Sequence, residues 1–332
     1  MVRLLSVTPP KPQRIDPKKL PAKGTAKSGR PGGRPPGAPK VRKATARDWI
    51  AGARLRTIPL AIAPVALGTA IAYSPDEGWH WVRALLALAV AVSLQIGVNY
   101  ANDYSDGVRG TDKRRVGPAR LTGSGAAKPR AVLTVALVFF ALAAAAGVAL
   151  VVLSQQWILL AVGAVCIVAA WFYTGGKRPY GYYGFGELFV FVFFGLVATA
   201  GTTYTQIGSV PVNAWVAGVA IGLLACATLM INNLRDREQD KLAGKRTLAV
   251  LIGDVPSRVV YAVLVAAPFL ILIFFTLLYD KAGYVFFALL AAGPAILIGV
   301  MGKEASDRII ALQLTTLTAF LYGVGLALAI AF

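Results

Sequence analysis

Residues 82–112 read VRALLALAVAVSLQIGVNYANDYSDGVRGTD, an apolar run that ends in a cluster of carboxylates. The apolar part, 82–101, has about the 20 residues that an α-helix needs to cross a bilayer core. Segments of the same kind lie at 56–73, 131–153, 156–173, 187–207, 213–233, 258–279, 283–300 and 309–331. Since a backbone in lipid must satisfy its own hydrogen bonds, all of them are expected to be helical. The sequence therefore predicts an all-α membrane protein with nine transmembrane helices.

The composition excludes an ordinary soluble domain. Of the 332 residues, 57% are apolar and 15% are charged, whereas about a quarter of the residues of a soluble domain are charged. Cys166 and Cys226 lie in separate apolar segments, far from the single histidine, His80. This arrangement predicts neither a disulfide framework nor a zinc site.

The basic residues divide the chain into two regions. Residues 1–48 hold 13 Lys and Arg against two acids, which gives 13 − 2 = +11 of the net charge of +19, and they are rich in Pro and Gly. We expect a disordered tail that binds anionic lipid headgroups. Since 1–48 has no aromatic side chain to stack on bases, no nucleic-acid partner is expected. Residues 49–332 form the predicted polytopic domain.

Basic residues also favour one set of the loops between the predicted spans. The loops after 82–101, 156–173, 213–233 and 283–300 are rich in Lys and Arg, whereas the other set holds only Arg83 and Lys281. Lys and Arg accumulate on the cytoplasmic side of membrane proteins. The asymmetry predicts a multi-pass protein of the cell membrane with a cytoplasmic N-terminus, cytoplasmic basic loops and an outside C-terminus.

Six acidic residues gather in two clusters at the predicted inside ends of two helices. They are Asp103, Asp106 and Asp112, and Asp236, Glu238 and Asp240. Asn99 and Asp103 are four residues apart, as are Asn232 and Asp236, so each pair shares a helix face. The pattern recurs after 236 − 103 = 133 residues. It suggests two related four-helix units plus a ninth helix, with a site at the interface of the units.

Oxygen-rich clusters of this kind suit Mg²⁺, which takes one or two carboxylates and completes its shell with water and phosphate oxygens. Two clusters facing one cavity could hold a Mg²⁺-bridged diphosphate. Basic residues on the same side could neutralise it; these are Lys128, Arg130, Lys177, Arg178, Lys245 and Arg246. We interpret Glu238 and Lys241 instead as part of a solvated helix end.

Several motifs resemble one known family. They are Arg54-Leu-Arg-Thr-Ile-Pro59, Asn102-Asp-Tyr-Ser-Asp-Gly-Val-Arg-Gly-Thr-Asp112, Tyr173-Thr-Gly-Gly, Pro179-Tyr-Gly-Tyr-Tyr-Gly-Phe-Gly-Glu187, Asn232-Asn-Leu-Arg-Asp-Arg-Glu-Gln-Asp240 and Gly244-Lys-Arg-Thr-Leu-Ala249. Together they resemble the UbiA-type intramembrane prenyltransferases, and within these the 1,4-dihydroxy-2-naphthoate polyprenyltransferases of menaquinone biosynthesis. The resemblance covers about residues 49–331. Asp112 departs from the wider family because it follows Asp106 by six residues instead of four.

The resemblance implies nine helices around a central cavity and Mg²⁺-dependent ionisation of a polyprenyl diphosphate. The prenyl group would pass to 1,4-dihydroxy-2-naphthoate with loss of CO₂, giving demethylmenaquinone. Metal ligands would be Asp103, Asp106, Asp236 and Asp240, with Asp112 as a further candidate, steadied by Asn99, Asn102 and Asn232. Lys245 and Arg246 would hold the departing anion. Aromatic side chains, among them Tyr173, would line the cavity and exclude water.

The pocket for the aromatic acceptor leaves alternatives open. Arg54 and Arg56, or Lys177 and Arg178, could bind the acceptor carboxylate. Another aromatic acid such as 4-hydroxybenzoate remains possible as the acceptor. Glu187 could cap the fifth predicted span or face the cavity, and we favour the cap. An ion-coupled transporter is a remote alternative, because the middle of every span is free of Asp, Glu, Lys and Arg.

Overall fold

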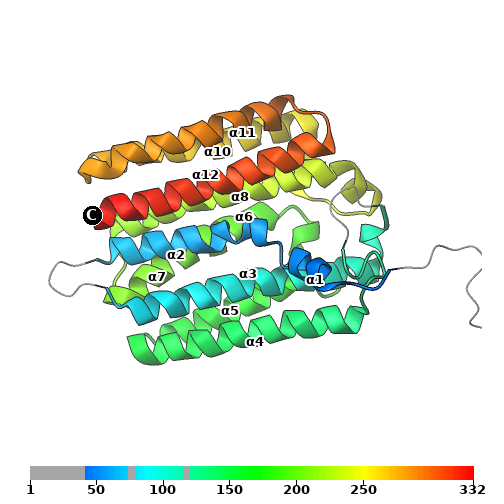
Figure 1. The fold of residues 1–332 in the computed structure, drawn as a ribbon, viewed down its shortest axis with the longest axis horizontal. Coiled ribbons are helices and arrows are strands. Elements are labelled where there is room, and N and C mark those ends of the chain that lie inside the picture. Colours follow the sequence, from blue (N-terminus) through cyan, green and yellow to red (C-terminus); the bar gives the residue numbers. More distant parts are fainter. Residues whose placement is uncertain (1–41, 74–78, 115–119) are drawn as a thin grey trace, which may run out of the picture. The chain divides into compact units, whose positions relative to one another are not determined.

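The computed structural model describes residues 42–73, 79–114 and 120–332, and every regular element in this part is a helix (Figure 1). The α-helices are α1 (Ala46–Gly52), α2 (Pro59–Ile71), α3 (Trp81–Arg109), α4 (Pro129–Ser154), α5 (Ile158–Phe172), α6 (Gly186–Val190), α7 (Ala198–Ile207), α8 (Val212–Leu242), α9 (Leu248–Ile252), α10 (Asp254–Thr276), α11 (Leu289–Met301) and α12 (Ala305–Ala331). Shorter 3₁₀ helices are η2 (Leu55–Thr57), η3 (Thr111–Arg114), η4 (Tyr180–Tyr182) and η6 (Asp280–Ala288), and η5 (Phe191–Val197) is a π-helix. The predicted all-α class is confirmed.

Each of the predicted spans falls on helix, but the count of nine is not confirmed. Within the described ranges, seven helices or continuous helical stretches are long and apolar enough to cross a membrane. The pair Ala46–Thr57 and Pro59–Ile71, bent by 45°, would make an eighth. α5 is apolar but has 15 residues, fewer than the roughly 20 of a full span. The chain leaves this helix at Thr174-Gly-Gly, where Gly176 has a φ of 74°.

Most of the predicted tail, residues 1–41, lies outside the described residues. Residues 42–48, the end of the predicted tail, are described and lead into α1. There the Asp48 carboxylate accepts hydrogen bonds from the backbone N–H and the hydroxyl of Thr45. α1 leads to Arg54, which has a left-handed φ of 55°, and the chain then turns into α2. Pro59 stands at the first position of α2, where its missing N–H costs no helical hydrogen bond.

α8 is the most buried long helix and contacts α10, α12, α2 and η5. Its side chains form much of a core that also includes Leu67, Leu272 and Tyr322. The π-helix η5 approaches α8 closely at Gly195, because a Cβ there would lie 2.5 Å from the Gly218 carbonyl oxygen. This contact sets α6, η5 and α7 as one 22-residue stretch, Gly186–Ile207, against α8.

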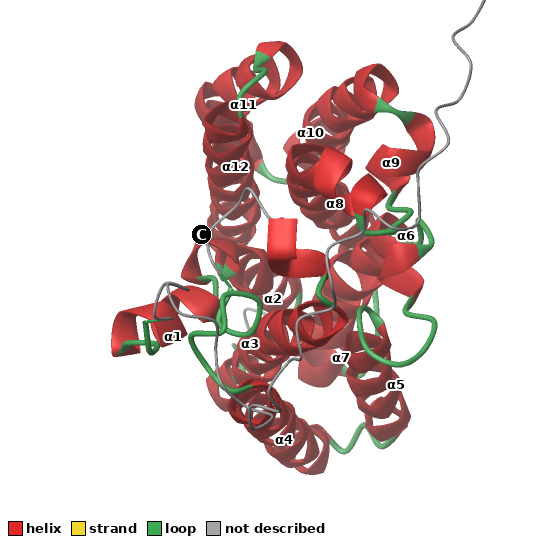
Figure 2. Cartoon of the chain, turned by 90° about the vertical axis from the view of Figure 1, so that its right-hand side faces the viewer, coloured by secondary structure: helices red, strands yellow, loops and turns green. Residues whose placement is uncertain are grey.

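The two helices that carry the aspartate clusters end on the same side. α3 and α8 both run toward the right of Figure 1, and Lys245, just after α8, reaches Asp106 in α3 with an Nζ–Oδ2 distance of 2.9 Å. Figure 2 looks onto this end, with α10 and α11 at one edge, α4 and α5 at the other, and α2 and α3 between them. The fold therefore brings residues about 140 positions apart to one end of the helices.

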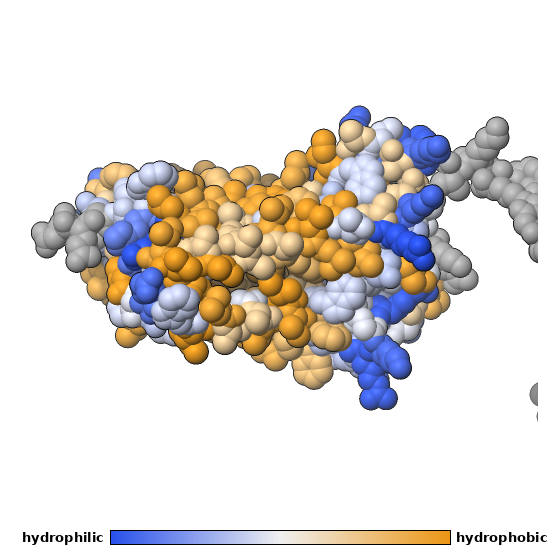
Figure 3. All heavy atoms as spheres, turned by 90° about the horizontal axis from the view of Figure 1, so that it is seen from below, coloured by the Kyte–Doolittle hydropathy of each residue, from blue (hydrophilic) through white to orange (hydrophobic). Residues whose placement is uncertain are grey.

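The outer surface agrees with a membrane environment. Figure 3 shows a band of apolar atoms between two hydrophilic ends. Large apolar side chains on different helices point outward, including Leu270 at 72% and Leu290 at 77% exposure. A continuous apolar band of this kind is costly in water and favourable in lipid. The chain is a multi-pass membrane protein.

Candidate active site

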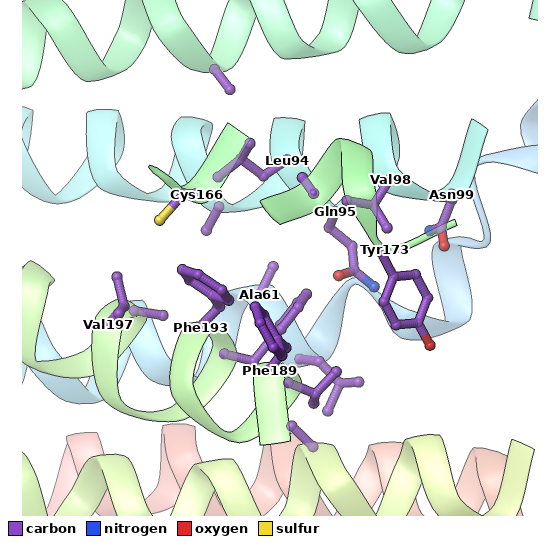
Figure 4. Close-up of a pocket in the computed structure, with 18 of the residues that line it drawn as sticks. Ala61, Leu94, Gln95, Val98, Asn99, Cys166, Tyr173, Phe189, Phe193 and Val197 are labelled. Carbon is purple, nitrogen blue, oxygen red and sulfur yellow. The ribbon is translucent and has the colours of Figure 1, made fainter. Parts of the chain in front are cut away.

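A cavity of about 540 Å³ lies between α2, α3, α4, α5, the Gly186–Ile207 stretch and α8. Its polar lining residues at the end where the aspartate clusters lie include Arg54, Arg56, Gln95, Asn99, Asn102, Asp106, Arg120, Tyr173, Tyr182, Asn232, Asn233, Asp236, Asp240 and Lys245. Figure 4 shows Gln95, Asn99 and Tyr173 on one side of the close-up and Phe189, Phe193 and Val197 on the other. The cavity thus joins a charged end to an apolar interior.

Asp106 is the centre of the charged end and is 2% exposed. It accepts hydrogen bonds from the Tyr182 hydroxyl at 2.7 Å and from Lys245 Nζ at 2.9 Å, and Arg120 lies 3.8 Å away. Lys245 also lies 3.9 Å from Asp240. One cation therefore connects a carboxylate from each of the two sequence clusters, which are far apart along the chain.

Arg120 stays protonated in this setting. Burial lowers the pKa of its guanidinium, but Asp112, Asp106 and Asp103 together raise it by more, so the pKa lies above its usual value. Burial likewise raises the pKa of the Tyr182 phenol, and Asp106 raises it further. The phenol therefore keeps its proton and can donate it in the hydrogen bond to Asp106.

Asp103 has a different role in the wall of the cavity. Its two carboxylate oxygens accept hydrogen bonds from the backbone N–H groups of Leu121 and Thr122, at 2.9 and 2.8 Å. It is 2% exposed and does not line the cavity. These bonds hold the loop that carries Arg120. Each carboxylate oxygen keeps a second lone pair, so the predicted role of Asp103 as a metal ligand stays a prediction.

The second cluster is arranged around Arg235. Its guanidinium donates from Nε to Asp236 Oδ1 at 2.7 Å and from one terminal nitrogen to Asp236 Oδ2 at 2.6 Å. The same nitrogen also donates to Asn232 Oδ1 at 2.9 Å. A bidentate pair of this kind fixes the carboxylate plane. Asn232, Asp236 and Asp240 all line the cavity, as their four-residue spacing predicts.

The segment after α5 closes the charged end. Arg109 donates to the backbone carbonyl oxygens of Thr174 and Gly176, and the Thr174 hydroxyl donates to Asn102 Oδ1 at 2.6 Å. The ring of Tyr182 lies under two cations, 5.2 Å from Arg109 and 4.7 Å from Lys245. The motifs Tyr173-Thr-Gly-Gly and Pro179–Glu187 thus meet the first aspartate cluster directly.

Several predicted substrate-binding residues do not line the cavity. Lys128, Lys177, Arg178 and Arg246 are exposed, and Asp112 contacts Arg120 at 3.8 Å outside the lining. The structure brings together ten of the predicted site residues as cavity lining; they are Arg54, Arg56, Asn99, Asn102, Asp106, Tyr173, Asn232, Asp236, Asp240 and Lys245.

Sequence reasoning missed other residues of the site. Arg120 and Tyr182 contact Asp106, and Arg235 binds Asp236, yet none of the three was singled out. Tyr182 lies within a motif that resembles the family, which is a usable signal. Glu187, expected to cap a helix, lies in the first turn of α6 and accepts a hydrogen bond from Asn233 at 3.0 Å.

The apolar interior is lined by small and aromatic side chains. Phe189 and Phe193 project into it from the start of the Gly186–Ile207 stretch (Figure 4), and the ring of Phe189 stacks on Tyr180 with centroids 3.9 Å apart. Gly163 and Gly201 also line the cavity, and, apart from the adjacent backbone of its own helix, no atom lies within 4 Å of a Cβ built on either. This part of the cavity can therefore hold a long apolar group.

Cations and carboxylates meet an apolar interior between the membrane helices, an arrangement that suits a ligand with an anionic end and an apolar tail. Residues 61–311 match the sequence profile of the UbiA prenyltransferase family. The chain belongs to this family, whose members are prenyltransferases, and the resemblance predicted from the motifs is confirmed.

Relatives and solved structures support this assignment. The chain is 51% identical over 261 residues to a Mycobacterium tuberculosis protein named 1,4-dihydroxy-2-naphthoate octaprenyltransferase, covering 79% of this chain and 84% of the relative. An Escherichia coli protein of the same name is 38% identical, with coverage of 74% and 81%.

Two archaeal structures share the fold at 17% identity. The UbiA homolog from Archaeoglobus fulgidus bound to DMAPP and Mg²⁺ has a TM-score of 0.57 and covers 86% of this chain and 99% of its own. The apo UbiA homolog from Aeropyrum pernix K1 has a TM-score of 0.62, with coverage of 80% and 95%.

Proposed function

We propose that this protein transfers a polyprenyl group from a polyprenyl diphosphate to 1,4-dihydroxy-2-naphthoate in menaquinone biosynthesis. Carbon dioxide and diphosphate would leave, and the product would be the reduced form of demethylmenaquinone. The observation that carries the proposal is the 51% identity to a protein named for this reaction, across 84% of that protein. The cavity supports it because its charged end and apolar interior match the two ends of the donor.

The diphosphate would lie at the charged end. Arg120 and Lys245 are half-buried cations on the cavity wall that already contact Asp106. A diphosphate gains charge when the allylic C–O bond breaks, and fixed cations stabilise that charge without reorganising. We assign Arg120 and Lys245 to hold the departing anion, and we keep Arg246, which is exposed, as a weaker candidate.

The charged end also fits Mg²⁺. Asp106, Asp236 and Asp240 present carboxylates to one cavity. In the part of the chain that the structure describes, no three His, Cys, Asp or Glu side chains form a ready-made metal cluster. Mg²⁺ needs only one or two carboxylates beside water and phosphate oxygens, so Asp106, Asp236 and Asp240 would hold it. When bound, Mg²⁺ supplies positive charge to the diphosphate oxygens during ionisation of the donor.

The acceptor would enter beside Arg54 and Arg56, which line the same cavity as Gln95 and Tyr173. A guanidinium can bind a carboxylate through two parallel hydrogen bonds, so these residues suit the carboxylate of the naphthoate. Lys177 and Arg178 are exposed and outside the lining, which favours the arginines among the two predicted pairs.

We further propose that the charged end faces the cytoplasm and that the C-terminus is outside. The asymmetry of Lys and Arg between alternate loops supports this orientation. We keep the binding of residues 1–48 to anionic lipid headgroups as part of the same proposal, since this basic segment would meet the negatively charged cytoplasmic leaflet.

A side-by-side assay of two acceptors tests the proposed reaction. Membranes that contain the protein are incubated with a polyprenyl diphosphate, Mg²⁺ and either 1,4-dihydroxy-2-naphthoate or 4-hydroxybenzoate. We expect a prenylated naphthalene product with release of CO₂ and no product from 4-hydroxybenzoate. Membranes that lack the protein are the control. Prenylated hydroxybenzoate as the main product would contradict the proposal and assign the chain another acceptor.

A further inference from the structure

Three side-chain amides that line the cavity are oriented by the wall behind them. They belong to Gln95 and Asn99 in α3 and to Asn233 in α8. In each, the NH₂ group donates a hydrogen bond to a protein acceptor. The direction of an amide decides whether it presents a donor or an acceptor to a ligand, and the hydrogen-bonding capacity of the partner fixes that direction.

Asn99 and Gln95 have only one possible orientation. Asn99 Nδ2 lies 3.0 Å from the Ala53 carbonyl oxygen, which can only accept. Gln95 Nε2 lies 2.8 Å from the Thr57 hydroxyl. That hydroxyl already donates its hydrogen to the Arg54 carbonyl oxygen at 2.9 Å, so it must accept from Gln95.

Asn233 is oriented by a buried carboxylate. Its Nδ2 donates to Glu187 Oε1 at 3.0 Å, and a carboxylate only accepts. Glu187 is 8% exposed. Its backbone carbonyl oxygen accepts a hydrogen bond from Cys226 Sγ at 3.1 Å, which fixes α6 against α8. Glu187 therefore lies behind the cavity wall, and its contact with the cavity lining is the hydrogen bond that orients Asn233.

An amide is planar, and its oxygen and nitrogen point in different directions from the same carbon. When the nitrogen faces the wall, the carbonyl oxygen turns toward the cavity. Asn102 has the reverse arrangement, because its oxygen accepts from Thr174. Gln95, Asn99 and Asn233 thus offer hydrogen-bond acceptors to a ligand, and of these Asn99 keeps the role predicted for it beside the metal. Of the two proposed substrates only the dihydroxynaphthoate carries hydroxyl donors. Its 4-hydroxyl is free to donate, and its 1-hydroxyl lies beside the carboxylate and shares its hydrogen with it. Waters on the proposed Mg²⁺ are the other source of donors, and a change in the KM for the diphosphate alone would identify them.

We propose that Gln95 and Asn233 bind the hydroxyl groups of the aromatic acceptor, and that Glu187 is a positioning residue for Asn233. This inference rests on the proposed function, since it names the part of the site that recognises the proposed acceptor. Buried acceptors left without a donor are costly, so the same pair of amides selects against aromatic acids that lack the hydroxyls.

Equilibrium binding to the purified full chain tests the inference with four acids. They are 1,4-dihydroxy-2-naphthoate, 1-hydroxy-2-naphthoate, 4-hydroxy-2-naphthoate and 2-naphthoate. We expect the 4-hydroxyl to tighten binding to the wild-type protein by about tenfold, and the 1-hydroxyl to add less, because it already donates to the neighbouring carboxylate. Gln95→Met and Asn233→Leu should each lose the preference for one hydroxyl while the affinity for 2-naphthoate stays within about twofold, because only the hydrogen bond is removed.

Two variants of Glu187 separate positioning from other roles. Glu187→Gln keeps an oxygen that accepts from Asn233 and should retain most of the hydroxyl preference, whereas Glu187→Leu should lose as much as Asn233→Leu. Asn213→Leu is the matched control, because Asn213 lies in the same helix and donates its amide to Tyr279 outside the cavity lining. An unchanged KM for the polyprenyl diphosphate shows that each variant is folded.

The inference is overturned if the variants weaken all four acids equally, if the hydroxyl preference survives Asn233→Leu and Gln95→Met, or if only the KM for the diphosphate changes. Equal losses in Glu187→Gln and Glu187→Leu would overturn the positioning role. If the wild-type protein prenylates 4-hydroxybenzoate instead, the proposed function fails, and a comparison of 4-hydroxybenzoate with benzoate then tests the hydroxyl-binding amides separately.

Discussion

Asp103 at the end of α3 and Asp236 at the end of α8 occupy the same position in two Asn-x-x-x-Asp patterns, yet they bind different partners. Asp103 accepts two backbone N–H groups of the loop at Leu121 and Thr122. Asp236 accepts two bonds from the guanidinium of the neighbouring Arg235 and lines the cavity. A repeated spacing therefore places carboxylates at matching ends of two helices, but their partners differ, since a loop binds Asp103 and the adjacent residue of the same helix binds Asp236.

The two clusters also differ in how many of their carboxylates face the cavity. In the first cluster, Asp106 faces the cavity and binds Lys245, Tyr182 and Arg120. In the second, Asp236 and Asp240 both face it. The proposed metal site thus takes one carboxylate from the first cluster and two from the second. Of the four catalytic aspartates predicted from the sequence, three line the cavity, and Asp103 binds backbone N–H groups of the loop at Leu121 and Thr122.

The largest effect is expected at the three aspartates that face the cavity. Asp106→Asn, Asp236→Asn and Asp240→Asn should each lower turnover by about a hundredfold or more, because an amide keeps the shape but loses the charge that binds Mg²⁺. Turnover of purified protein is measured across a Mg²⁺ titration. Near-normal turnover of any one variant at saturating Mg²⁺ would remove that residue from the metal site.

Asp103→Asn should act on stability as well as on turnover. An amide in place of the carboxylate sets an NH₂ group against a backbone N–H of Leu121 or Thr122, and each lost bond to a charged group costs about 1.5–3 kcal/mol. The midpoint of thermal unfolding in detergent should fall, and the loop carrying Arg120 should become more open to proteolysis. An unchanged midpoint and intact loop, with turnover lost, would instead favour direct metal binding by Asp103.

Lys245 and Arg246 are adjacent and allow a narrower test of the diphosphate end. Lys245 is half-buried and contacts Asp106 and Asp240, whereas Arg246 is exposed. Lys245→Gln should lower kcat/KM for the polyprenyl diphosphate by about tenfold or more, and Arg246→Gln should change it by about twofold or less. Equal losses would show that the exposed arginine also meets the substrate.

Much of the fold was predictable because the length of each apolar segment indicates a membrane helix. Each apolar segment is helical in the structure, and 213–233 falls within α8, which continues to Leu242. The number of full spans was harder, since α5 is apolar along its length but has only 15 residues. The π-helix η5 was not predicted, and the close approach of its Gly195 to Gly218 in α8 is a tertiary contact that apolar length does not reveal.

The candidate site was predictable only where it depends on local spacing. The four-residue periodicity placed Asn232, Asp236 and Asp240 on one face, and all three line the cavity. Lys245 meets Asp106 across 139 positions of sequence, and Tyr182 meets it across 76. No periodicity relates such pairs, because tertiary packing creates them. Asn233 was passed over for the same reason, since its partner Glu187 lies in another helix.

The smallest effect is expected at Glu238, which belongs to the second cluster but does not line the cavity. Its side chain is 63% exposed and pairs with Arg237, and an exposed ion pair contributes about 0–1 kcal/mol. Glu238→Gln should therefore leave turnover and its Mg²⁺ dependence within about twofold of the wild-type protein, beside the large loss in Asp240→Asn two residues further on. The two variants are assayed in membranes prepared in the same way, and the amount of each protein in the membrane is measured beside its turnover. A strong loss in Glu238→Gln would mean that negative charge at this helix end matters as a whole, and the division of the cluster into cavity-facing and solvated carboxylates would be wrong.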